Sequence, residues 1–192
     1  MGQEKLPARD RILECSRTLF SEHSFDKVSL RDIARQAEVS VALIVKHFQN
    51  KEHLFAETID FATSSAALFS GPFAELGRTA VTETLTAPST AHYSIARAIS
   101  VANGQPGSLE AIGNRIKTDI LQVLAQRIAD EAPNPNPKPE LRAQAVMSML
   151  VGLSVMRRFG DTDFDSYAFA ELVSYYGAQV QDILNGDPSL SG

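Results

Sequence analysis

Apolar residues recur every three or four positions along most of this chain, a spacing that places them on one face of an α-helix. One such face runs from Ile12 to Phe20, and a longer one runs from Ile112 to Ile128. The sequence contains no repeat of fixed length and no convincing pair of strands. The pattern therefore predicts an all-α protein.

Capping and breaking residues divide this pattern into segments. Ser29 and Ser40 each precede a short apolar-periodic stretch, and serine is a favoured helix N-cap. The Gly71-Pro72 pair and the run Pro133–Pro139 cannot continue a helix. We expect helices over residues 8–22, 30–37, 41–48, 51–69, 73–85, 89–102, 109–132, 140–158 and 167–184.

Charge is unevenly distributed along the 192 residues, whose formal net charge is -5. Residues 1–51 carry nine Lys and Arg against seven Asp and Glu, a net of +2, whereas residues 52–192 carry nine against sixteen, a net of -7. This charge balance argues against a uniformly basic surface that binds nucleic acid, but it allows a local basic patch. A polyanion is therefore expected to bind the N-terminal part of the chain.

Cys15 is the single cysteine, so an intrachain disulfide is impossible and a reducing compartment is indicated. The N-terminal segment lacks the apolar core of a signal peptide, and no run approaches the roughly 18 apolar residues of a membrane span. These features predict a cytoplasmic protein without a membrane segment.

The segment from Ser29 to Phe48 has the layout of a helix-turn-helix, in which two short helices meet at Glu38-Val39-Ser40. The second helix would enter the major groove of DNA, with its early residues against the base edges. Ser40 at its start would leave backbone N–H groups for a phosphate, and Lys46 and Lys51 could neutralise other phosphates. A packed helical hairpin with no role in DNA binding would show the same spacing.

A set of apolar, capping and charged positions adds weight to the DNA-binding interpretation. They are Ile12, Leu13, Leu19, Phe20, Phe25, Val28, Ser29, Ile33, Ala34, Ala37, Val39, Ser40, Ile44, His47, Phe48, Lys51, Glu52 and Leu54. In these positions the chain resembles the N-terminal domain of the TetR family of transcriptional regulators, without a gap over about a quarter of its length. The resemblance implies a helix-turn-helix DNA-binding domain over residues 1–50 and a helical ligand-binding and dimerisation domain over residues 51–192.

Several positions depart from the family pattern. Ser24 and Glu38 stand where the family usually has glycine, and Ala42 and Val45 stand where it often has glycine and tyrosine. Glu38 would be strained if the turn requires a positive φ, and Val45 lacks a hydroxyl that commonly supports a phosphate contact. The candidate DNA-contacting residues are Ser29, Arg31, Ser40, Val41, Ala42, Leu43, Val45, Lys46, His47 and Lys51.

These departures leave a second interpretation open, a helical interaction protein of the same fold with weakened or lost DNA binding. An enzyme is disfavoured because the sequence offers no constellation of acid, base and nucleophile, so we expect no catalytic residues. The four histidines, at positions 23, 47, 53 and 92, form no metal-binding pair at helical spacing. We therefore expect neither a metal nor a cofactor.

The segment from Ala145 to Met156 is apolar almost all round, so its helix is expected to be buried on more than one side. Together with the last helix it could form an isologous four-helix interface. We expect a homodimer that reads two half-sites of double-stranded operator DNA, with a monomeric core as the alternative.

The resemblance also implies a repressor that a small molecule releases from DNA. An apolar ligand is expected to bind within residues 52–192 and to act through one continuous helix over 51–69. Each candidate pocket residue also suits an ordinary core position. These candidates are Phe69, Phe73, His92, Tyr93, Ile116, Met147 and Val151.

Overall fold

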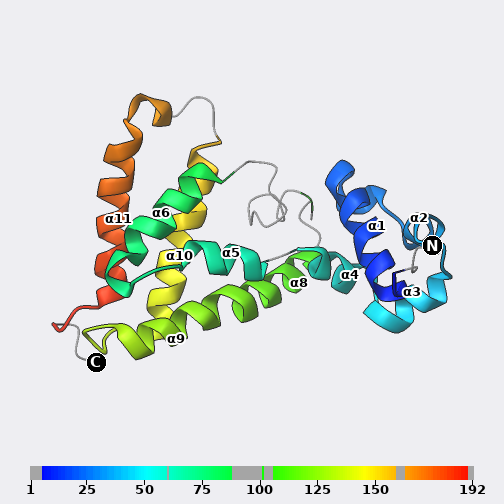
Figure 1. Ribbon diagram of the computed structural model, residues 1–192, viewed down its shortest axis with the longest axis horizontal. Helices are drawn as coiled ribbons and strands as arrows, with labels where there is room; N and C mark the ends of the chain where they lie inside the picture. The colour runs from blue at the N-terminus through cyan, green and yellow to red at the C-terminus, as the bar shows by residue number, and fades with distance from the viewer. Residues whose placement is uncertain (1–5, 60, 88–100, 102–105, 159–162, 190–192) are drawn as a thin grey trace, which may run out of the picture. The chain divides into compact units, whose positions relative to one another are not determined.

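The computed structural model describes residues 6–59, 61–87, 101, 106–158 and 163–189 (Figure 1). Within these ranges every regular element is helical, which confirms the predicted all-α class. The chain forms two compact units. One combines Met1–Asp60 with Arg97–Arg115, and the other combines Phe61–Ala96 with Ile116–Gly192.

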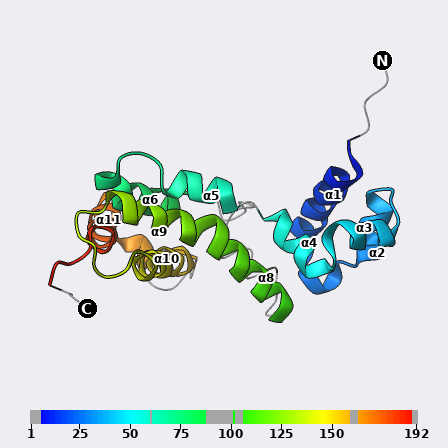
Figure 2. The same ribbon diagram turned by 90° about the horizontal axis from the view of Figure 1, so that it is seen from below.

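The first helices of the N-terminal unit form a small cluster around one apolar core (Figures 1 and 2). The elements of this cluster are α1 (Ala8–Glu22), the 3₁₀ turn η1 (Phe25–Lys27), α2 (Leu30–Gln36), α3 (Val41–Phe48) and α4 (Lys51–Thr58). Most of α8 (Pro106–Ile116) is assigned to the same unit. The apolar faces predicted from spacing are buried: Ile12, Ile33 and Ile44 are fully shielded from solvent. This burial fixes the orientation of each short helix, because an isolated helix of seven or eight residues is unstable in water.

Three phenylalanines join α1, η1 and α4. The ring of Phe20 lies 4.9 Å from that of Phe55 in an edge-on arrangement and 5.9 Å from that of Phe25 in a stacked one. The Phe25 and Phe55 rings are 5.3 Å apart. Such pairs add to the stability gained from burial alone, so the cluster holds α4 against α1 and η1.

The continuous helix predicted over residues 51–69 is wrong. The structure has two helices there, α4 ending at Thr58 and α5 (Phe61–Leu68), with Ile59 extended at φ -92° and ψ 124°. Ile59 and Phe61 are both buried. Extended backbone at Ile59 fits the conformational preference of a β-branched residue.

The C-terminal unit is built from longer helices. The expected helix over 73–85 begins with a 3₁₀ turn, and the one over 109–132 contains a π-helical segment at Lys117–Leu121. The expected helix over 89–102 lies almost wholly outside the described residues. The elements are α5, η2 (Phe73–Glu75), α6 (Leu76–Thr86), the π-segment η3 (Lys117–Leu121), α9 (Gln122–Glu131), α10 (Pro139–Met156), η4 (Phe164–Ser166) and α11 (Phe169–Asn185).

Helices α6 and α11 lie side by side and cross at two glycines (Figures 1 and 2). A Cβ added to Gly77 would lie 2.3 Å from the carbonyl oxygen of Gly177 and 2.7 Å from the backbone nitrogen of Gln181. The Gln181 side chain then secures the crossing, since it accepts a hydrogen bond from the Gly77 N–H at 2.9 Å and donates one to the Phe73 carbonyl at 3.1 Å. Only glycine permits helices to approach so closely.

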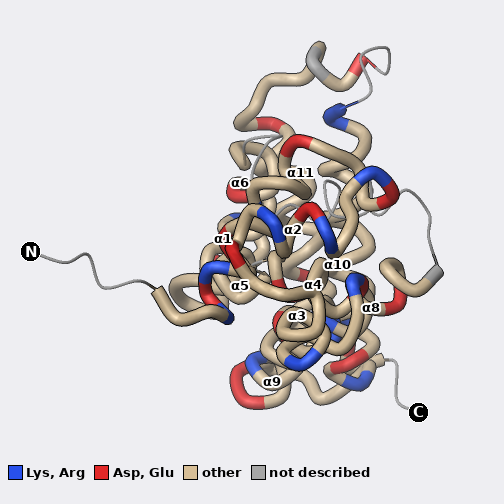
Figure 3. The backbone as a smooth tube through the Cα atoms, turned by 90° about the vertical axis from the view of Figure 1, so that its right-hand side faces the viewer, with Lys and Arg blue, Asp and Glu red and all other residues tan. Residues whose placement is uncertain are grey.

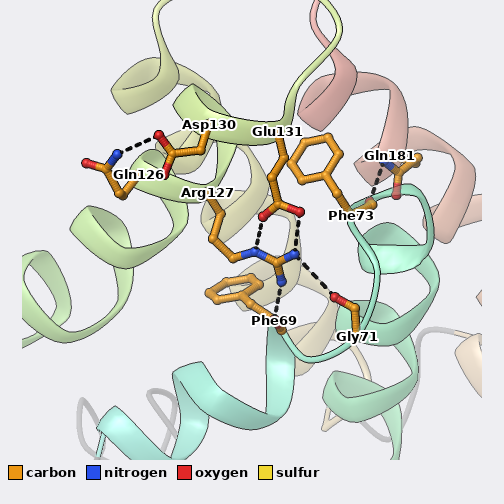
Figure 4. A network of polar contacts seen from close by, with 8 residues as sticks. All are labelled: Phe69, Gly71, Phe73, Gln126, Arg127, Asp130, Glu131 and Gln181. Atoms are coloured by element: carbon orange, nitrogen blue, oxygen red, sulfur yellow. Dashed lines mark hydrogen bonds and ion pairs between the residues drawn. The ribbon is translucent and has the colours of Figure 1, made fainter.

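An arginine from α9 binds the end of α5 (Figure 4). Arg127 donates hydrogen bonds to the carbonyls of Phe69 at 2.6 Å and Gly71 at 3.2 Å, and Glu131 holds the guanidinium at 2.6 and 2.9 Å. These bonds from Arg127 lower the pKa of the Glu131 carboxyl. The arrangement satisfies carbonyls that a helix end leaves without intrahelical partners.

Two further arginines serve other helix ends in the same way. Arg157 donates to the carbonyls of Leu85 and Ala87 at the end of α6, and the buried Arg142 donates to the Leu184 carbonyl of α11 at 3.0 Å. A positive charge at a helix C-terminus also interacts favourably with the helix dipole. Arginines distant in sequence therefore cap three helices of this unit.

Candidate nucleic-acid interface

The first helix of the helix-turn-helix begins at a reciprocal cap. The Ser29 hydroxyl accepts a hydrogen bond from the Asp32 N–H at 3.2 Å, and the Asp32 carboxylate accepts one from the Ser29 N–H at 3.3 Å. The bonds from Ser29 lower the pKa of the Asp32 carboxyl, so the cap is charged at neutral pH. The serine predicted as an N-cap is therefore confirmed in that role.

The turn between α2 and α3 is a Schellman motif. The Val39 N–H donates to the Ala34 carbonyl at 3.0 Å, and the Glu38 N–H donates to the Arg35 carbonyl at 3.4 Å. The motif requires a left-handed residue at its centre, where glycine is usual. Glu38 occupies that position with φ +54°, so the strain predicted for this residue is present.

Replacing Glu38 by glycine is expected to stabilise the protein by about 1 kcal/mol, because glycine adopts positive φ without steric cost. Urea denaturation followed by circular dichroism measures the change. Glu38→Ala removes the same carboxylate but keeps the Cβ, so it should give no such gain. Equal stabilisation by both variants would assign the effect to charge instead of backbone strain.

The second helix, α3, is fixed by its cap and by two core residues. The Ser40 hydroxyl accepts a hydrogen bond from the Leu43 N–H at 3.2 Å, which confirms the predicted N-cap. Ile44 and Phe48 are buried, and Leu43 is half-buried. The remaining side chains of α3 face solvent, namely Val41, Ala42, Val45, Lys46 and His47.

A γ-turn ends α3, which sequence reasoning missed. Gln49 has φ +67° and ψ -56°, and the Asn50 N–H donates to the Phe48 carbonyl at 2.8 Å. This form of the γ-turn is rare and strained. The Asn50 side chain then accepts from the His53 N–H at 2.8 Å and starts α4. Strained residues thus lie on both sides of α3, where glycine would have been the signal for positive φ.

Lys51 points into the protein. Its ammonium donates hydrogen bonds to the carbonyls of Phe25 at 2.9 Å and Val28 at 3.1 Å, and lies 4.0 Å from the centre of the Phe25 ring. The side chain therefore joins α4 to the segment that leads into α2. This geometry favours an internal role for Lys51 over the predicted phosphate contact.

Other basic residues of the unit remain at the surface. Arg31, Lys46 and His47 are exposed, and Arg35 is exposed while paired with Asp32 at 3.3 Å. Figure 3 shows the Lys and Arg positions of α2 and α3 in blue. The helix-turn-helix therefore presents a positive charge at Lys46, which takes part in no ion pair among the described residues.

Two arginines of α1, which sequence reasoning did not single out, support the same unit. Arg11 donates to the Ala37 carbonyl at 3.3 Å, where α2 ends, and to the Leu6 carbonyl at 2.9 Å. Arg9 pairs with Glu57 of α4 and lies 5.3 Å from the centre of the Phe48 ring. These contacts join α1 to α2, α3 and α4, so α1 acts as the platform on which the helix-turn-helix rests.

The candidate ligand residues are dispersed among the elements of the C-terminal unit. Phe69 and Met147 are buried, and Phe73, Ile116 and Val151 are half-buried. The two remaining candidates, His92 and Tyr93, lie outside the described residues. Their shared role in ligand binding stays a prediction.

A groove of about 740 Å³ opens elsewhere in this unit. The Pro-rich connection before α10, the start of α10 and the end of α11 line it, and none of the candidate ligand residues takes part. Across the described ranges, no group of three metal-binding side chains gathers. No helix there has the length and apolar character needed to cross a membrane.

Two family models match the chain. The model described as "Bacterial regulatory proteins, tetR family" matches residues 12–58, and "Tetracyclin repressor-like, C-terminal domain" matches residues 74–184. Together they cover the helix-turn-helix and most of the C-terminal unit.

Curated relatives match over a short segment. IcaR, the negative transcriptional regulator of the biofilm operon icaADBC of Staphylococcus epidermidis, is 31% identical over 52 residues, which are 27% of this chain and 28% of IcaR. The HTH-type transcriptional regulator UidR of Escherichia coli K12 is 36% identical over 59 residues, which are 31% of this chain and 30% of UidR. The chain thus matches less than a third of the length of either relative.

Solved structures match along nearly the whole chain. GusR of Salmonella enterica superposes with a TM-score of 0.67 at 17% identity, over 95% of this chain and 97% of GusR. The TetR-family regulator SCO0857 of Streptomyces coelicolor gives 0.59 at 24% identity, over 95% and 99%. These likenesses show a shared fold. With the two family models, they establish that this chain belongs to the TetR family of bacterial regulatory proteins.

Proposed function

We propose that the protein is a transcriptional repressor that binds operator DNA through α3. The observation that carries this proposal is the composition of the α3 surface, where Val41, Ala42, Val45 and Lys46 share one exposed face while Ile44 anchors the helix in the core. A recognition helix needs such a free face at its N-terminal end. The relative IcaR is named as a negative transcriptional regulator, which favours repression over the interaction protein without DNA binding.

We further propose that the repressor is a homodimer formed through α10 and α11. One side of α10 packs in the core, through residues such as Val146 and Leu150. The other side is exposed and largely apolar or small, at Leu141, Ala145, Ser148, Gly152 and Met156. An exposed apolar row of this length marks an association surface, and a two-fold dimer would present two copies of α3 to a partly palindromic site.

A small-molecule effector that binds the C-terminal unit and lowers DNA affinity completes the proposal. Its support is the TetR-type C-terminal match over residues 74–184 and the apolar interior of that unit. Because α4 and α5 are separate helices, the effect of ligand binding on DNA binding would be transmitted through the extended Ile59 and not along one continuous helix. The site of action is proposed to be the cytoplasm, as the lone Cys15 indicates.

Electrophoretic mobility shifts with DNA upstream of the protein's own gene test the repressor proposal. We expect a discrete complex that excess nonspecific DNA does not remove, and a footprint with two related half-sites. Absence of any preferred duplex, both there and in a selection from random sequence, would support the interaction protein instead.

Two lysine variants separate DNA contact from folding. Lys46→Met is expected to weaken DNA binding and to reduce the salt dependence by about one unit of slope, with unchanged stability, because Lys46 is exposed. Lys51→Met should instead destabilise the protein by about 2 kcal/mol, since it leaves two carbonyls without their charged donor. Urea denaturation and binding titrations between low and moderate salt measure both quantities.

The opposite pattern would contradict the internal role of Lys51. If Lys51→Met flattens the salt slope while stability stays unchanged, Lys51 contacts phosphate, as the sequence alone had suggested. If Lys46→Met leaves affinity and slope unchanged, Lys46 does not contact the DNA backbone.

A further inference from the structure

The solvent-facing part of α3 is unusual in its chemistry. Val41 is 36% exposed and Val45 is 44% exposed, and Ala42 lies between them on the same side of the helix. Branched apolar side chains normally contribute by burial, yet these contribute little to the core of the unit. Their exposure is therefore a feature that a DNA partner can explain.

The polar groups near this surface are already engaged or lie beyond it. The Ser40 hydroxyl caps α3 through Leu43 N–H, and Leu43 itself is half-buried. Lys46 is the first exposed polar side chain after the cap. The first turn and a half of α3 thus offers the base edges mainly aliphatic carbon.

Aliphatic side chains can distinguish only one base-edge group in the major groove. Guanine, cytosine and adenine present hydrogen-bonding atoms there, whereas thymine also presents a C5-methyl group. Valine and alanine have no side-chain donor or acceptor, so they cannot read the hydrogen-bonding pattern. They can bury a methyl group and exclude water from it.

We propose that α3 reads its operator through thymine C5-methyl groups, which Val41, Ala42 and Val45 contact directly. The inference rests on the proposed function of α3 as the DNA-recognition helix and specifies the base feature that it recognises. Each half-site would then contain A·T pairs at the positions that face these three residues. Lys46, farther along the helix, would add the phosphate contact proposed above.

The test begins with duplexes selected by the full-length protein from a pool of random sequence. Each thymine of the selected site is then replaced in turn by uracil, which removes the methyl group and retains base pairing and the O4 acceptor. Burial of one methylene-sized group corresponds to about 0.8 kcal/mol, so we expect about fourfold weaker binding at each thymine that faces α3. Uracil in the flanking sequence should have no effect.

A mutant cycle assigns the contact to a residue. In the Val45→Ala protein, we replace the thymine that faces residue 45 by uracil. This change should weaken binding clearly less than it does in the wild-type protein, because the shorter alanine side chain no longer contacts the methyl group. Val123→Ala is a matched control, since Val123 of α9 is also 44% exposed but lies outside the helix-turn-helix unit. That variant should keep the full wild-type response to uracil.

Each outcome bears on one of the two proposals. Specific binding with position-dependent losses on uracil substitution supports methyl recognition. Specific binding that uracil leaves unchanged at every thymine overturns it while the DNA-binding proposal stands, and base specificity would then come from other groups. Failure to select any preferred duplex overturns the proposed function itself.

Discussion

Gly77→Ala is expected to destabilise the C-terminal unit by about 3 kcal/mol, the upper end of the usual cost of overpacking. A Cβ at this position would lie 2.3 Å from the carbonyl oxygen of Gly177 and 2.9 Å from the Cβ of Gln181. Backbone atoms of α11 cannot move aside as a flexible side chain can, so α6 and α11 must separate. Urea denaturation followed by circular dichroism measures the loss.

Gly113→Ala is the matched control. Gly113 lies in helix α8, and a Cβ there would meet no atom within 4 Å. Replacement of a helical glycine by alanine in open space should stabilise the protein by about 0.5 to 1 kcal/mol. If Gly77→Ala were as stable as Gly113→Ala, the two helices would not cross at the separation described above.

Gly152→Glu is expected to break the proposed dimer and to weaken binding to a two-half-site operator by about 100-fold or more. Gly152 is exposed on α10 with no atom near its added Cβ, so the isolated chain tolerates a side chain there. In a dimer interface the same side chain would bury an unpaired carboxylate. Loss of the partner also removes the high effective concentration that joins the two half-site contacts.

Sedimentation at micromolar concentration gives the mass, and titration of the operator gives the affinity. Gly113→Glu introduces the same charge at another exposed helical glycine and should remain a dimer with wild-type affinity. A wild-type mass of one chain would refute the dimer. A dimeric Gly152→Glu protein would place the contact elsewhere than at α10.

Local interactions explain how much of the helix-turn-helix could be predicted from the sequence. Ser29 and Ser40 were identified as N-caps because the hydroxyl of each meets an N–H only three residues away. The helix over about Ala8–Glu22 was likewise predicted from its apolar spacing and is confirmed as α1. The strain at Glu38 could be predicted because the resemblance identified a turn position where glycine is usual.

Predictions that assumed continuity along the chain were less successful. The apolar pattern continues through residues 51–69, but α4 ends at Thr58 and the backbone of Ile59 is extended. Helix prediction from apolar spacing depends only on which residues are apolar. One extended residue, Ile59, changes this spacing too little to be recognised in the sequence. The same limitation hid the γ-turn at Gln49, since glutamine carries no signal for positive φ.

The sequence by itself determined the helical class and the position of α3, the proposed recognition helix, since these depend on side chains within one or two helical turns of each other. It also indicated the family, through matching positions spread from Ile12 to Leu54. Only the tertiary structure decided what Lys51, Arg127 and Arg157 bind, because their carbonyl partners lie as many as 26, 58 and 72 residues away. A lysine in the sequence is equally compatible with a phosphate and with a backbone carbonyl. The fold favours the carbonyls, because it brings those of Phe25 and Val28 within hydrogen-bonding distance of Lys51.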